Sequence, residues 1–364
     1  MLAPSSARLT IDLDALAHNY AVLKDQAGGA EMAPVLKSDG YGLGAGPLGR
    51  RLWAEGARAF FVARLSEGEA LRTALGSERP AVIHVLDGFT AGTGPRLAAA
   101  GLTPVVTSLP QIDAAQAFAA QAGGALAIGL HVDTGMNRQG LTPDEARAVA
   151  QSPDRLQGLA VELIMSHLGS ATEPAHPRSA AQLALFRPVR ALFPQARASL
   201  SASAGIFLGA DYRFDMVRPG VSLYGGGPEE RPDSRLKAVA RLEAPVLDIR
   251  NIAAGAMVGY GSGVVVDRPT RVAIVQAGYA DGIIRMAKGE GRAWFAGELR
   301  RMLIVTMDLI AVDIGQAKAQ PGDMVELLGP NALLDDLAAV AGSVAHECLV
   351  RLSDRAERIY LGSV

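Results

Sequence analysis

Lys37 is the first residue whose type and position could do chemistry. It follows a short apolar run in the segment Val35-Leu36-Lys37-Ser38-Asp39-Gly40-Tyr41-Gly42. A lysine at the carboxyl end of a buried strand can form a Schiff base with a carbonyl cofactor, or act as a base if burial lowers its pKa. On position alone, a lysine that ends a strand and reaches solvent is the commoner case.

Two later segments also place polar side chains behind apolar runs. Residues 131–138 read His-Val-Asp-Thr-Gly-Met-Asn-Arg, and His167 follows the run from Leu163 to Ser166. His167 could orient another group or stack on a ring, and a core histidine bonded to backbone is about as frequent. Residues 131–138 are equally compatible with a turn that carries a surface arginine, Arg138.

Residues 214–220 read Phe-Asp-Met-Val-Arg-Pro-Gly, so that Arg218 and a Pro-Gly turn close an apolar run. Backbone N–H groups after such a turn suit an anion such as phosphate. Ser201 and Ser203 could add hydroxyl groups to the same site. A serine and a glycine are weak evidence by themselves.

Three segments in the last third of the chain contain residues that could be catalytic. Tyr260 stands between two glycines, which allow the backbone to approach a ligand closely. Residues 278–282 repeat this pattern around Tyr279, and Thr306-Met307-Asp308 interrupts a long apolar run. Each alone is more often structural than catalytic.

The elements that must position these residues alternate between strand and helix patterns over the first two thirds of the chain. About eight strand–helix units fit a TIM (β/α)8 barrel better than an open sheet, because side chains at the strand ends then share one mouth. The expected parallel strands cover residues 34–37, 60–63, 81–86, 104–107, 126–132, 159–166, 198–201 and 215–219.

Helix start signals support these units. Asp12 is an expected N-cap, and both Ser66 with Glu69 and Thr142 with Glu145 have the spacing of a capping box.

The pattern changes near Arg235 to strands joined by Gly, Asp and Pro turns, which indicates a mainly β second domain. We predict domains at residues 1–232 and 233–364, with residues 1–10 able to pair with the second. The expected strands cover residues 239–252, 257–266, 271–276, 292–295, 301–312 and 324–328, and the one expected helix covers 333–341.

Composition argues weakly against nucleic-acid or membrane binding, because the formal net charge is -2 and no long run of one sign occurs. Cys348 is the only cysteine, which fits a reducing compartment. The N-terminus shows no signal-peptide pattern, and no stretch is apolar and long enough to span a bilayer. We therefore expect a cytoplasmic protein with no metal site.

Taken together and in sequence order, these segments resemble the alanine racemase family over nearly the whole chain. Any one match is weak, but seven in order are strong. The matching segments are residues 35–42, 133–138, 165–168, 216–220, 258–261, 278–282 and Met307-Asp308.

The resemblance implies a TIM barrel followed by a β domain, in a head-to-tail homodimer with shared active sites. It implies that pyridoxal 5'-phosphate is bound to Lys37, that Lys37 and Tyr260 are the catalytic bases, and that Arg138, Met307 and Tyr279 contact the alanine substrate. The other implied cofactor-binding residues are Tyr41, His167, Ser203, Arg218, Gly220 and Val221.

The implied activity interconverts L-alanine and D-alanine by a two-base mechanism through an external aldimine, supplying D-alanine for peptidoglycan synthesis. Inversion at Cα requires one group to remove a proton from one face and another to return it on the opposite face. Tyr260 would need nearby positive or hydrogen-bonding groups to act as a phenolate, and His167 and Arg218 are the candidates. Because arginine has a pKa above about 12, Arg218 would leave the pyridine ring unprotonated.

Four positions depart from the family pattern. Many members carry a carbamylated lysine where His131 stands, and that lysine orients the arginine that matches Arg138. In this chain, Arg138 could be held by His131, by Asn137, by a bound anion or by nothing. Ala202 replaces a frequent asparagine, Asp354 lies where some members supply a tyrosine to the phosphate, and Gly40 replaces the usual alanine.

Two alternatives stay open. The first is another pyridoxal-dependent barrel enzyme, such as a racemase of serine or another small amino acid, an aldolase or a decarboxylase. The second is a cofactor-binding protein with little catalysis. Retention of Tyr260 and Arg218 favours racemisation.

Overall fold

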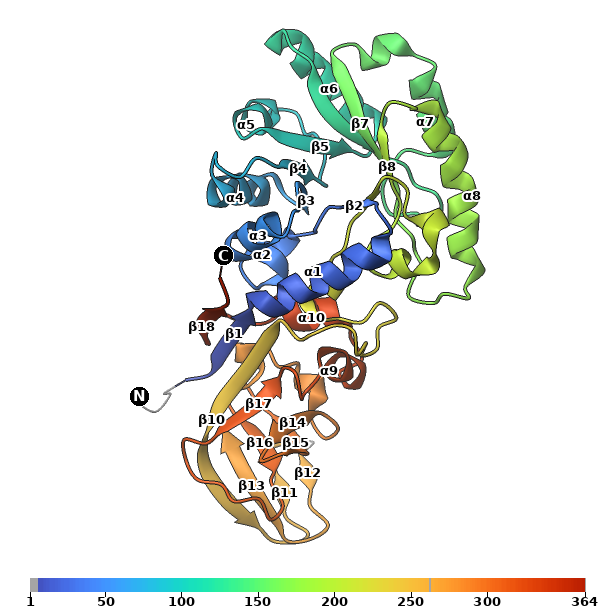
Figure 1. The fold of residues 1–364 in the computed structure, drawn as a ribbon. Coiled ribbons are helices and arrows are strands. Elements are labelled where there is room, and N and C mark those ends of the chain that lie inside the picture. Colours follow the sequence, from blue (N-terminus) through green and yellow to red (C-terminus); the bar gives the residue numbers. More distant parts are fainter. Residues whose placement is uncertain (1–5, 262, 364) are drawn as a thin grey trace. The chain divides into compact units, whose positions relative to one another are not determined.

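The computed structural model describes residues 6–261 and 263–363, which divide into two compact units (Figure 1). The parallel-strand unit contains residues 20–40 and 44–223. The antiparallel-sheet unit contains residues 6–19, 41–43 and 224–363. The N-terminal segment thus groups with the last third of the chain.

Six parallel strands in sequential order form the main sheet of the parallel-strand unit. Their short apolar sequences favour this arrangement, because strands covered on both faces are near-continuously hydrophobic. They are β3 (Ala59–Val62), β4 (Val82–Val85), β5 (Leu102–Val106), β6 (Leu126–His131), β7 (Leu159–Met165) and β8 (Arg197–Ser199). Each overlaps a strand that the sequence predicts.

Two further parallel strands, β2 (Glu31–Met32) and β9 (Met216–Val217), pair with each other. Single parallel bridges join Val35, beyond β2, to Phe61 of β3, and Ala202, beyond β8, to Arg218, beyond β9. The first predicted strand, residues 34–37, is therefore misplaced. Its regular pairing lies earlier, at β2, and only Val35 forms a bridge.

Helices follow most of these strands, and two of the three start signals are confirmed. The Asp12 carboxylate accepts the N–H groups of Asp14 and Ala15, and Thr142 Oγ1 accepts the N–H of Glu145 at 3.1 Å.

The helices are α1 (Leu13–Ala27), α2 (Lys37–Tyr41), α3 (Ala45–Ala54), α4 (Leu65–Leu75), α5 (Gly94–Ala99), α6 (Leu109–Ala122), α7 (Pro143–Ala150) and α8 (Pro177–Leu192), with 3-10 turns η1 (Pro153–Leu156), η2 (Ala204–Leu208), η3 (Ala210–Tyr212) and η4 (Val221–Tyr224).

The capping box predicted from Ser66 and Glu69 is wrong. Helix α4 begins at Leu65, and the carboxylate of Glu67 accepts the Arg64 N–H at 3.0 Å. Glu69 pairs instead with Arg96. The helix starts two residues earlier than the spacing suggests, so a different glutamate, Glu67, reaches its first turn.

An eight-stranded sheet dominates the antiparallel-sheet unit, in the order β13-β16-β15-β14-β17-β10-β1-β18. Strand β10 also pairs with β13, so the six strands from β13 to β10 close on themselves. The strands are β1 (Arg8–Asp12), β10 (Ala240–Ile252), β11 (Met257–Val258), β12 (Val264–Val265), β13 (Thr270–Val275), β14 (Arg292–Phe295), β15 (Glu298–Val305), β16 (Ile310–Asp313), β17 (Met324–Leu328) and β18 (Glu357–Leu361).

Four details of this unit differ from the sequence prediction. The segment 257–266 is a short hairpin of β11 and β12, and the segment 301–312 is split by a turn at residues 306–309. Strand β18 and helix α10 were not predicted. Beside the predicted helix α9 (Leu334–Val340), the unit has α10 (Ala345–Val350), η5 (Tyr279–Asp281) and η6 (Arg285–Ala287).

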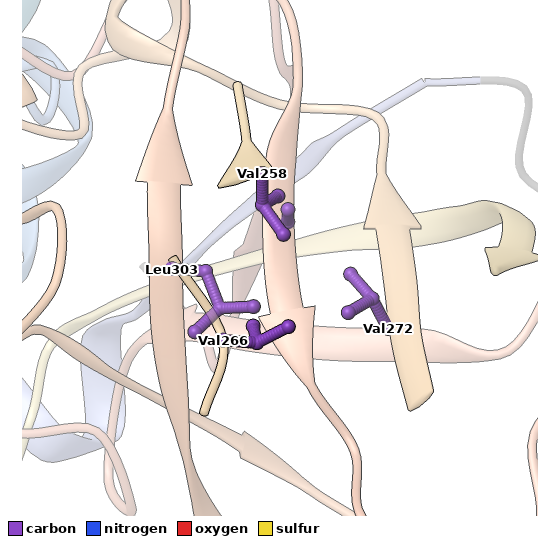
Figure 2. Close-up of a cluster of buried hydrophobic side chains, with 5 residues drawn as sticks. Val258, Val266, Val272 and Leu303 are labelled. Atoms are coloured by element: carbon purple, nitrogen blue, oxygen red, sulfur yellow. The ribbon is translucent and has the colours of Figure 1, made fainter. Parts of the chain in front are cut away.

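A cluster of buried side chains packs beneath the β11–β12 hairpin (Figure 2). Val258 from β11 and Val266 beyond β12 meet Val272 from β13 and Leu303 from β15, together with Ala311. Burial of such side chains contributes about 1.5–3 kcal/mol each. The cluster therefore anchors both strands of the hairpin.

Within the described residues, no helix has the length and apolar character that crossing a bilayer requires. The same residues contain no group of three or more His, Cys, Asp or Glu side chains arranged to hold a metal ion.

Candidate active site

Lys37 opens helix α2, which is a left-handed turn. A left-handed backbone costs an L-residue about 1–2 kcal/mol, so it persists only where the surroundings hold it. Four successive residues have φ between 52° and 63°: Ser38, Asp39, Gly40 and Tyr41. Strain of this kind clusters at functional sites.

Two carboxylates hold this turn. Glu67 Oε1 accepts the Ser38 N–H at 2.8 Å, and Asp39 Oδ1 accepts the Ala45 N–H at 2.7 Å. Gly40 has φ 63°, and a Cβ there would lie 2.5 Å from a methyl carbon of Leu48. The glycine that departs from the family pattern thus fits both the backbone and the packing.

Lys37 is half-buried, and its amine is influenced by the charges of Arg138 and Glu67. Burial lowers its pKa most, the charge of Arg138 lowers it further, and Glu67 partly opposes this. More of the amine is therefore unprotonated at neutral pH than for a lysine in water. This state is the one that attacks a carbonyl or accepts a proton.

Arg218 is fully enclosed at 3% exposure. Its guanidinium donates to Ser199 Oγ, to the Ser166 carbonyl at 2.7 Å and to the Leu200 carbonyl at 3.4 Å. Within the described chain, no carboxylate lies within ion-pair distance of it. Burial lowers the pKa of Arg218 to about 9, below the value expected from the sequence, and the group remains charged at neutral pH.

Histidines surround this charge in their neutral form. His167 Nδ1 lies 3.5 Å from Arg218 Nη2, and burial followed by the charge of Arg218 holds its pKa well below the ordinary value. The same two causes lower the pKa of His131 to about 4. Nδ1 of His131 is buried without a hydrogen-bond partner, and in the described chain no hydrogen bond joins His131 to Arg138.

His84 was not singled out by the sequence, yet it belongs to this group. Its ring stacks on Phe61 with centroids 4.6 Å apart, and the Arg218 guanidinium lies 5.8 Å from the same Phe61 ring. Burial and the charge of Arg218 lower the pKa of His84 to about 4. A histidine inside an apolar strand gives no sequence signal that separates this position from the core.

Ser203 contacts the turn that contains Gly220 and Val221, where the sequence predicts a phosphate site. Ser203 Oγ accepts the N–H groups of Gly220 at 2.9 Å and Ser222 at 3.3 Å. Its own proton is left to donate to another group. Ser201 donates to the Tyr212 carbonyl at 2.7 Å and is thereby engaged elsewhere.

The segment that carries Arg138 is a tight turn. Asp133 Oδ1 accepts the N–H groups of Gly135 and Met136, both at 2.8 Å. Thr134 Oγ1 and Ser166 Oγ lie 2.8 Å apart, both fully buried, and this bond ties the turn to the strand end before His167. The Arg138 side chain itself is exposed.

Tyr260 lies in the antiparallel-sheet unit, just after β11, and is 68% exposed. Gly259 and Gly261 on either side have φ of 96° and 61°. A Cβ on Gly259 would lie 3.0 Å from Ile304, so the strand approaches its neighbour closely there. The glycines thus present the phenol outward from an anchored backbone.

Tyr279 and Met307 are neighbours in the same unit. The Tyr279 N–H donates to the Thr306 carbonyl at 2.9 Å, and the Ala280 N–H donates to the Met307 carbonyl at 3.1 Å. Both side chains are exposed, at 39% and 52%. Arg355 joins the two segments through Asp281 and Asp308.

Tyr41 belongs to the antiparallel-sheet unit, where its ring contacts Tyr224 and His346 at centroid distances of 4.6 and 5.8 Å. Burial raises the pKa of its phenol. Asp354 has a highly exposed side chain that pairs with Arg358 at 3.0 Å.

The parallel-strand unit therefore gathers Lys37, Arg138, His167, Ser203, Arg218, Gly220 and Val221, and the antiparallel-sheet unit holds Tyr41, Tyr260, Tyr279 and Met307. Glu67 is the main supporting residue that the sequence analysis missed. Its position in the first turn of α4 was the available signal.

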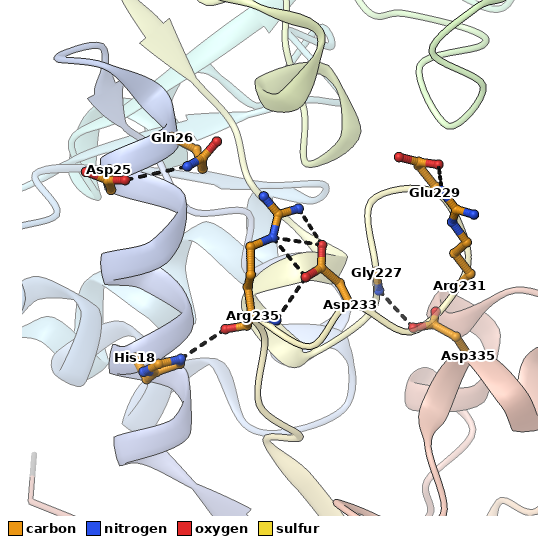
Figure 3. A network of polar contacts seen from close by, with 9 residues as sticks. All are labelled: His18, Asp25, Gln26, Gly227, Glu229, Arg231, Asp233, Arg235 and Asp335. Atoms are coloured by element: carbon orange, nitrogen blue, oxygen red, sulfur yellow. Dashed lines mark hydrogen bonds and ion pairs between the residues drawn. The ribbon is translucent and has the colours of Figure 1, made fainter.

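A cavity of about 360 Å³ lies elsewhere in the antiparallel-sheet unit. The loop beside it is held by the Gly227 N–H, which donates to Asp335 at 2.8 Å, and by ion pairs of Arg235 with Asp233 and of Arg231 with Glu229 (Figure 3). None of the predicted site residues lines this cavity.

Comparison with known proteins identifies the family. Residues 11–228 match the N-terminal domain of alanine racemase, and residues 239–360 match its C-terminal domain. The chain is 43% identical to an alanine racemase of Methylobacterium sp. (strain 4-46), with 99% of both proteins covered. It is 40% identical to a catabolic alanine racemase of Agrobacterium fabrum, covering 98% of this chain and 92% of that protein.

Among solved structures, the chain is similar to alanine racemase from Bartonella henselae with covalently bound pyridoxal phosphate. The TM-score is 0.92 at 35% identity, covering 98% of this chain and 100% of the other. The chain belongs to the alanine racemase family, a family of isomerases. This confirms the resemblance drawn from the motifs.

Proposed function

We propose that this protein is a pyridoxal-phosphate-dependent racemase that interconverts L-alanine and D-alanine with two bases, Lys37 and Tyr260. The observation that carries the proposal is the half-buried Lys37 amine with a lowered pKa, beside a left-handed turn and a set of buried cationic and neutral donors. An amine in this state is matched to an aldehyde cofactor.

The residues present fit the cofactor. Its phosphate requires several donors, and the Ser203 hydroxyl, which accepts the Gly220 N–H, has its own proton left to donate beside the backbone of Val221. Arg218 has hydroxyl and carbonyl partners but no carboxylate among the described residues, so its guanidinium would be available to the pyridine nitrogen of the cofactor without ion-pair competition. Lys37 would hold the cofactor covalently, and Tyr41 and His167 would complete its surroundings.

When bound, the cofactor supplies an electron sink that makes the Cα–H of alanine acidic enough to ionise. Lys37 Nζ and Tyr260 Oη lie on opposite faces of Cα in this proposal. One of them removes the proton from its face, and the other returns a proton on the opposite face. Arg138 and the backbone N–H of Met307 orient the substrate carboxylate, and Tyr279 lines the entrance. His167 and Arg218 provide the positive and hydrogen-bonding environment that favours the phenolate of Tyr260.

We further propose that the eight parallel strands β2 to β9 close into a (β/α)8 barrel within residues 1–232, followed by the β domain 233–364. The bridges Val35–Phe61 and Ala202–Arg218 and the β2–β9 pair support closure. The break between the two family matches, at residues 228 and 239, supports the division.

The site is proposed to be completed in a head-to-tail homodimer, in which the barrel of one chain receives Tyr260 and Met307 of a second copy. Both side chains are more than half exposed in the single chain. Exposed apolar and aromatic side chains at functional loops are typical of surfaces that a partner covers.

A cytoplasmic enzyme that supplies D-alanine for peptidoglycan is the expected physiological setting. The Agrobacterium relative is called catabolic, so D-alanine degradation is the second candidate role, and the growth requirement of a deletion strain for D-alanine separates the two. Serine and other small amino acids are tested in parallel, since one substituent changes binding by only about 1–3 kcal/mol.

The test is chiral analysis of L-alanine incubated with the purified protein and pyridoxal phosphate, with Lys37→Ala beside it. The enantiomers should approach parity only with the unmutated protein. Formation of a covalent cofactor complex without D-alanine would exclude alanine racemisation and favour another amino acid or a cofactor-binding role.

A further inference from the structure

Helix α8 presents two polar side chains to the loops of the candidate site. Its buried face follows the helical period through Ser179, Gln182, Leu183, Phe186 and Val189. Arg178 and Gln182 are four residues apart, so they project from neighbouring turns of one face. Neither has a role in the proposed reaction.

Gln182 is 1% exposed and uses both ends of its amide on one loop. Its Oε1 accepts the Gly169 N–H at 2.8 Å, and its Nε2 donates to the His167 carbonyl at 2.8 Å. These two bonds bracket the backbone directly after His167. They fix the direction from which the His167 ring meets Arg218.

Arg178 holds the other loop. Its Nε and Nη2 donate to the Gly135 carbonyl at 3.3 and 2.9 Å, in the turn that leads to Arg138. The guanidinium packs on Gly169, where an added Cβ would lie 2.7 Å from its Cζ. Because Gly169 has no side chain, Arg178 can lie across the loop that contains Gly169 and reach the turn that contains Gly135.

We propose that Gln182 and Arg178 are positioning residues for racemisation. Gln182 sets His167 against Arg218, and Arg178 sets the turn that carries Arg138. The buried hydroxyl pair of Thr134 and Ser166 couples the two loops, so α8 holds them as one assembly. This inference rests on the proposed function, because it takes the roles of His167 and Arg138 from there.

The experiment measures kcat and KM for L-alanine in the holoenzyme of three variants. Arg178→Lys should raise KM about 10-fold and leave kcat within about twofold, because a misplaced Arg138 weakens carboxylate binding. Gln182→Ala should lower kcat about 10-fold, shift its pH profile and leave KM within about twofold. Arg187→Lys is the matched control, since Arg187 also lies on α8 but forms a half-exposed pair with Asp211.

Gly169→Ala provides an independent approach to Arg178. The added methyl group would displace the flexible end of Arg178 without changing α8, so KM should rise as in Arg178→Lys. If Arg178→Lys and Gln182→Ala lower only the melting temperature, with kcat and KM unchanged, both residues are merely structural and the proposal is wrong.

A readout without turnover separates this inference from the proposed function. The pH titration of the visible absorbance of the bound cofactor should shift in Gln182→Ala and not in Arg187→Lys. Absence of racemisation by the unmutated protein, with this shift present, would overturn the proposed function and support the positioning role. An unshifted titration in Gln182→Ala would overturn the positioning role.

Discussion

Glu67 Oε1 accepts the backbone N–H of Ser38 at 2.8 Å, directly after the lysine proposed to hold the cofactor. The other oxygen of the same carboxylate accepts the N–H groups of Ala63 and Arg64, at 2.7 and 3.0 Å. One side chain thus joins the end of β3, the start of α4 and the left-handed turn. The same carboxylate also opposes the effects that lower the pKa of Lys37.

Glu67→Gln should shift the pH dependence of Lys37 reactivity to lower pH. Loss of the negative charge lowers the pKa of Lys37 further, so more free amine is present at a given pH. The measurement is the rate at which the cofactor-free protein is labelled at Lys37 by pyridoxal phosphate and borohydride, across a pH series. Glu69→Gln is the control, because Glu69 pairs with Arg96, and equal shifts in both variants would contradict the assignment.

Tyr260→Phe should lower racemisation by about 10²–10⁴-fold, the usual contribution of a general acid–base group. The melting temperature should stay nearly unchanged, because Tyr260 is 68% exposed within its own chain and phenylalanine keeps the ring at the proposed dimer contact. Chiral chromatography and a thermal melt give the two values. Full activity in the variant would rule out Tyr260 as the second base.

His84→Phe should make the stability of the cofactor-free protein less sensitive to acid. The pKa of His84 is about 4 in the folded protein and near 6.5 when unfolded, so the unfolded chain binds more protons between these values. Stability is therefore lost as pH falls from about 6.5 to 4, by about 3 kcal/mol for a shift of this size.

Denaturant unfolding at pH 7 and pH 5 measures this effect. Phenylalanine keeps the stacking on Phe61 and removes the titrating group. The difference between the two pH values should be smaller in the variant than in the unmutated protein, and an equal difference would show that His84 does not contribute.

Gly259→Ala should lower racemase activity about 10-fold or more, since small displacements of a reacting group have such effects. Its φ is 96°, and the added methyl carbon would lie 3.0 Å from Ile304, which displaces the backbone before Tyr260. Gly255→Ala is the control: its φ is 81°, with nothing within 4 Å of the added carbon. If Gly255→Ala loses as much thermal stability as Gly259→Ala but keeps its racemase activity, the loss of activity in Gly259→Ala is due to the displacement of Tyr260.

Dilution should lower the specific activity if a second copy completes the site. The activity per chain is then governed by the fraction of dimer, which depends on concentration. Activity and sedimentation are measured over the same dilution series. Full activity in a demonstrated monomer would refute the shared site.

Much of the fold was predictable from the sequence because apolar runs of strand length mark buried parallel strands. The strand predicted at residues 34–37 does not match the structure. Lys37 begins a left-handed turn there, and the pattern of apolar residues does not indicate such a turn. Strand β18 was missed for a different reason. Its sequence, Glu-Arg-Ile-Tyr-Leu, is half exposed and pairs in parallel with β1 at the other end of the chain, a contact that no local pattern reveals.

The grouping of Arg218 and His167 with the Ser203–Gly220 pair followed from motif order alone. What surrounds them did not. The neutral states of His131 and His84 and the lowered pKa of Arg218 all depend on burial, and burial arises from packing between strands distant in sequence. Glu67 and Gln182 form hydrogen bonds from a side chain to the backbone of another segment. The spacing of residues along the sequence could not predict these bonds.

The place of β1 in its sheet has a consequence for synthesis on the ribosome. Strand β1 contains residues 8–12, yet its antiparallel partner β10 begins at residue 240 and its parallel partner β18 at residue 357. Strand β1 therefore stays unpaired until β10 has been synthesised, and its second edge stays open until β18 follows. Until then it exposes unpaired edges, and edges of this kind are where nascent chains aggregate or recruit chaperones.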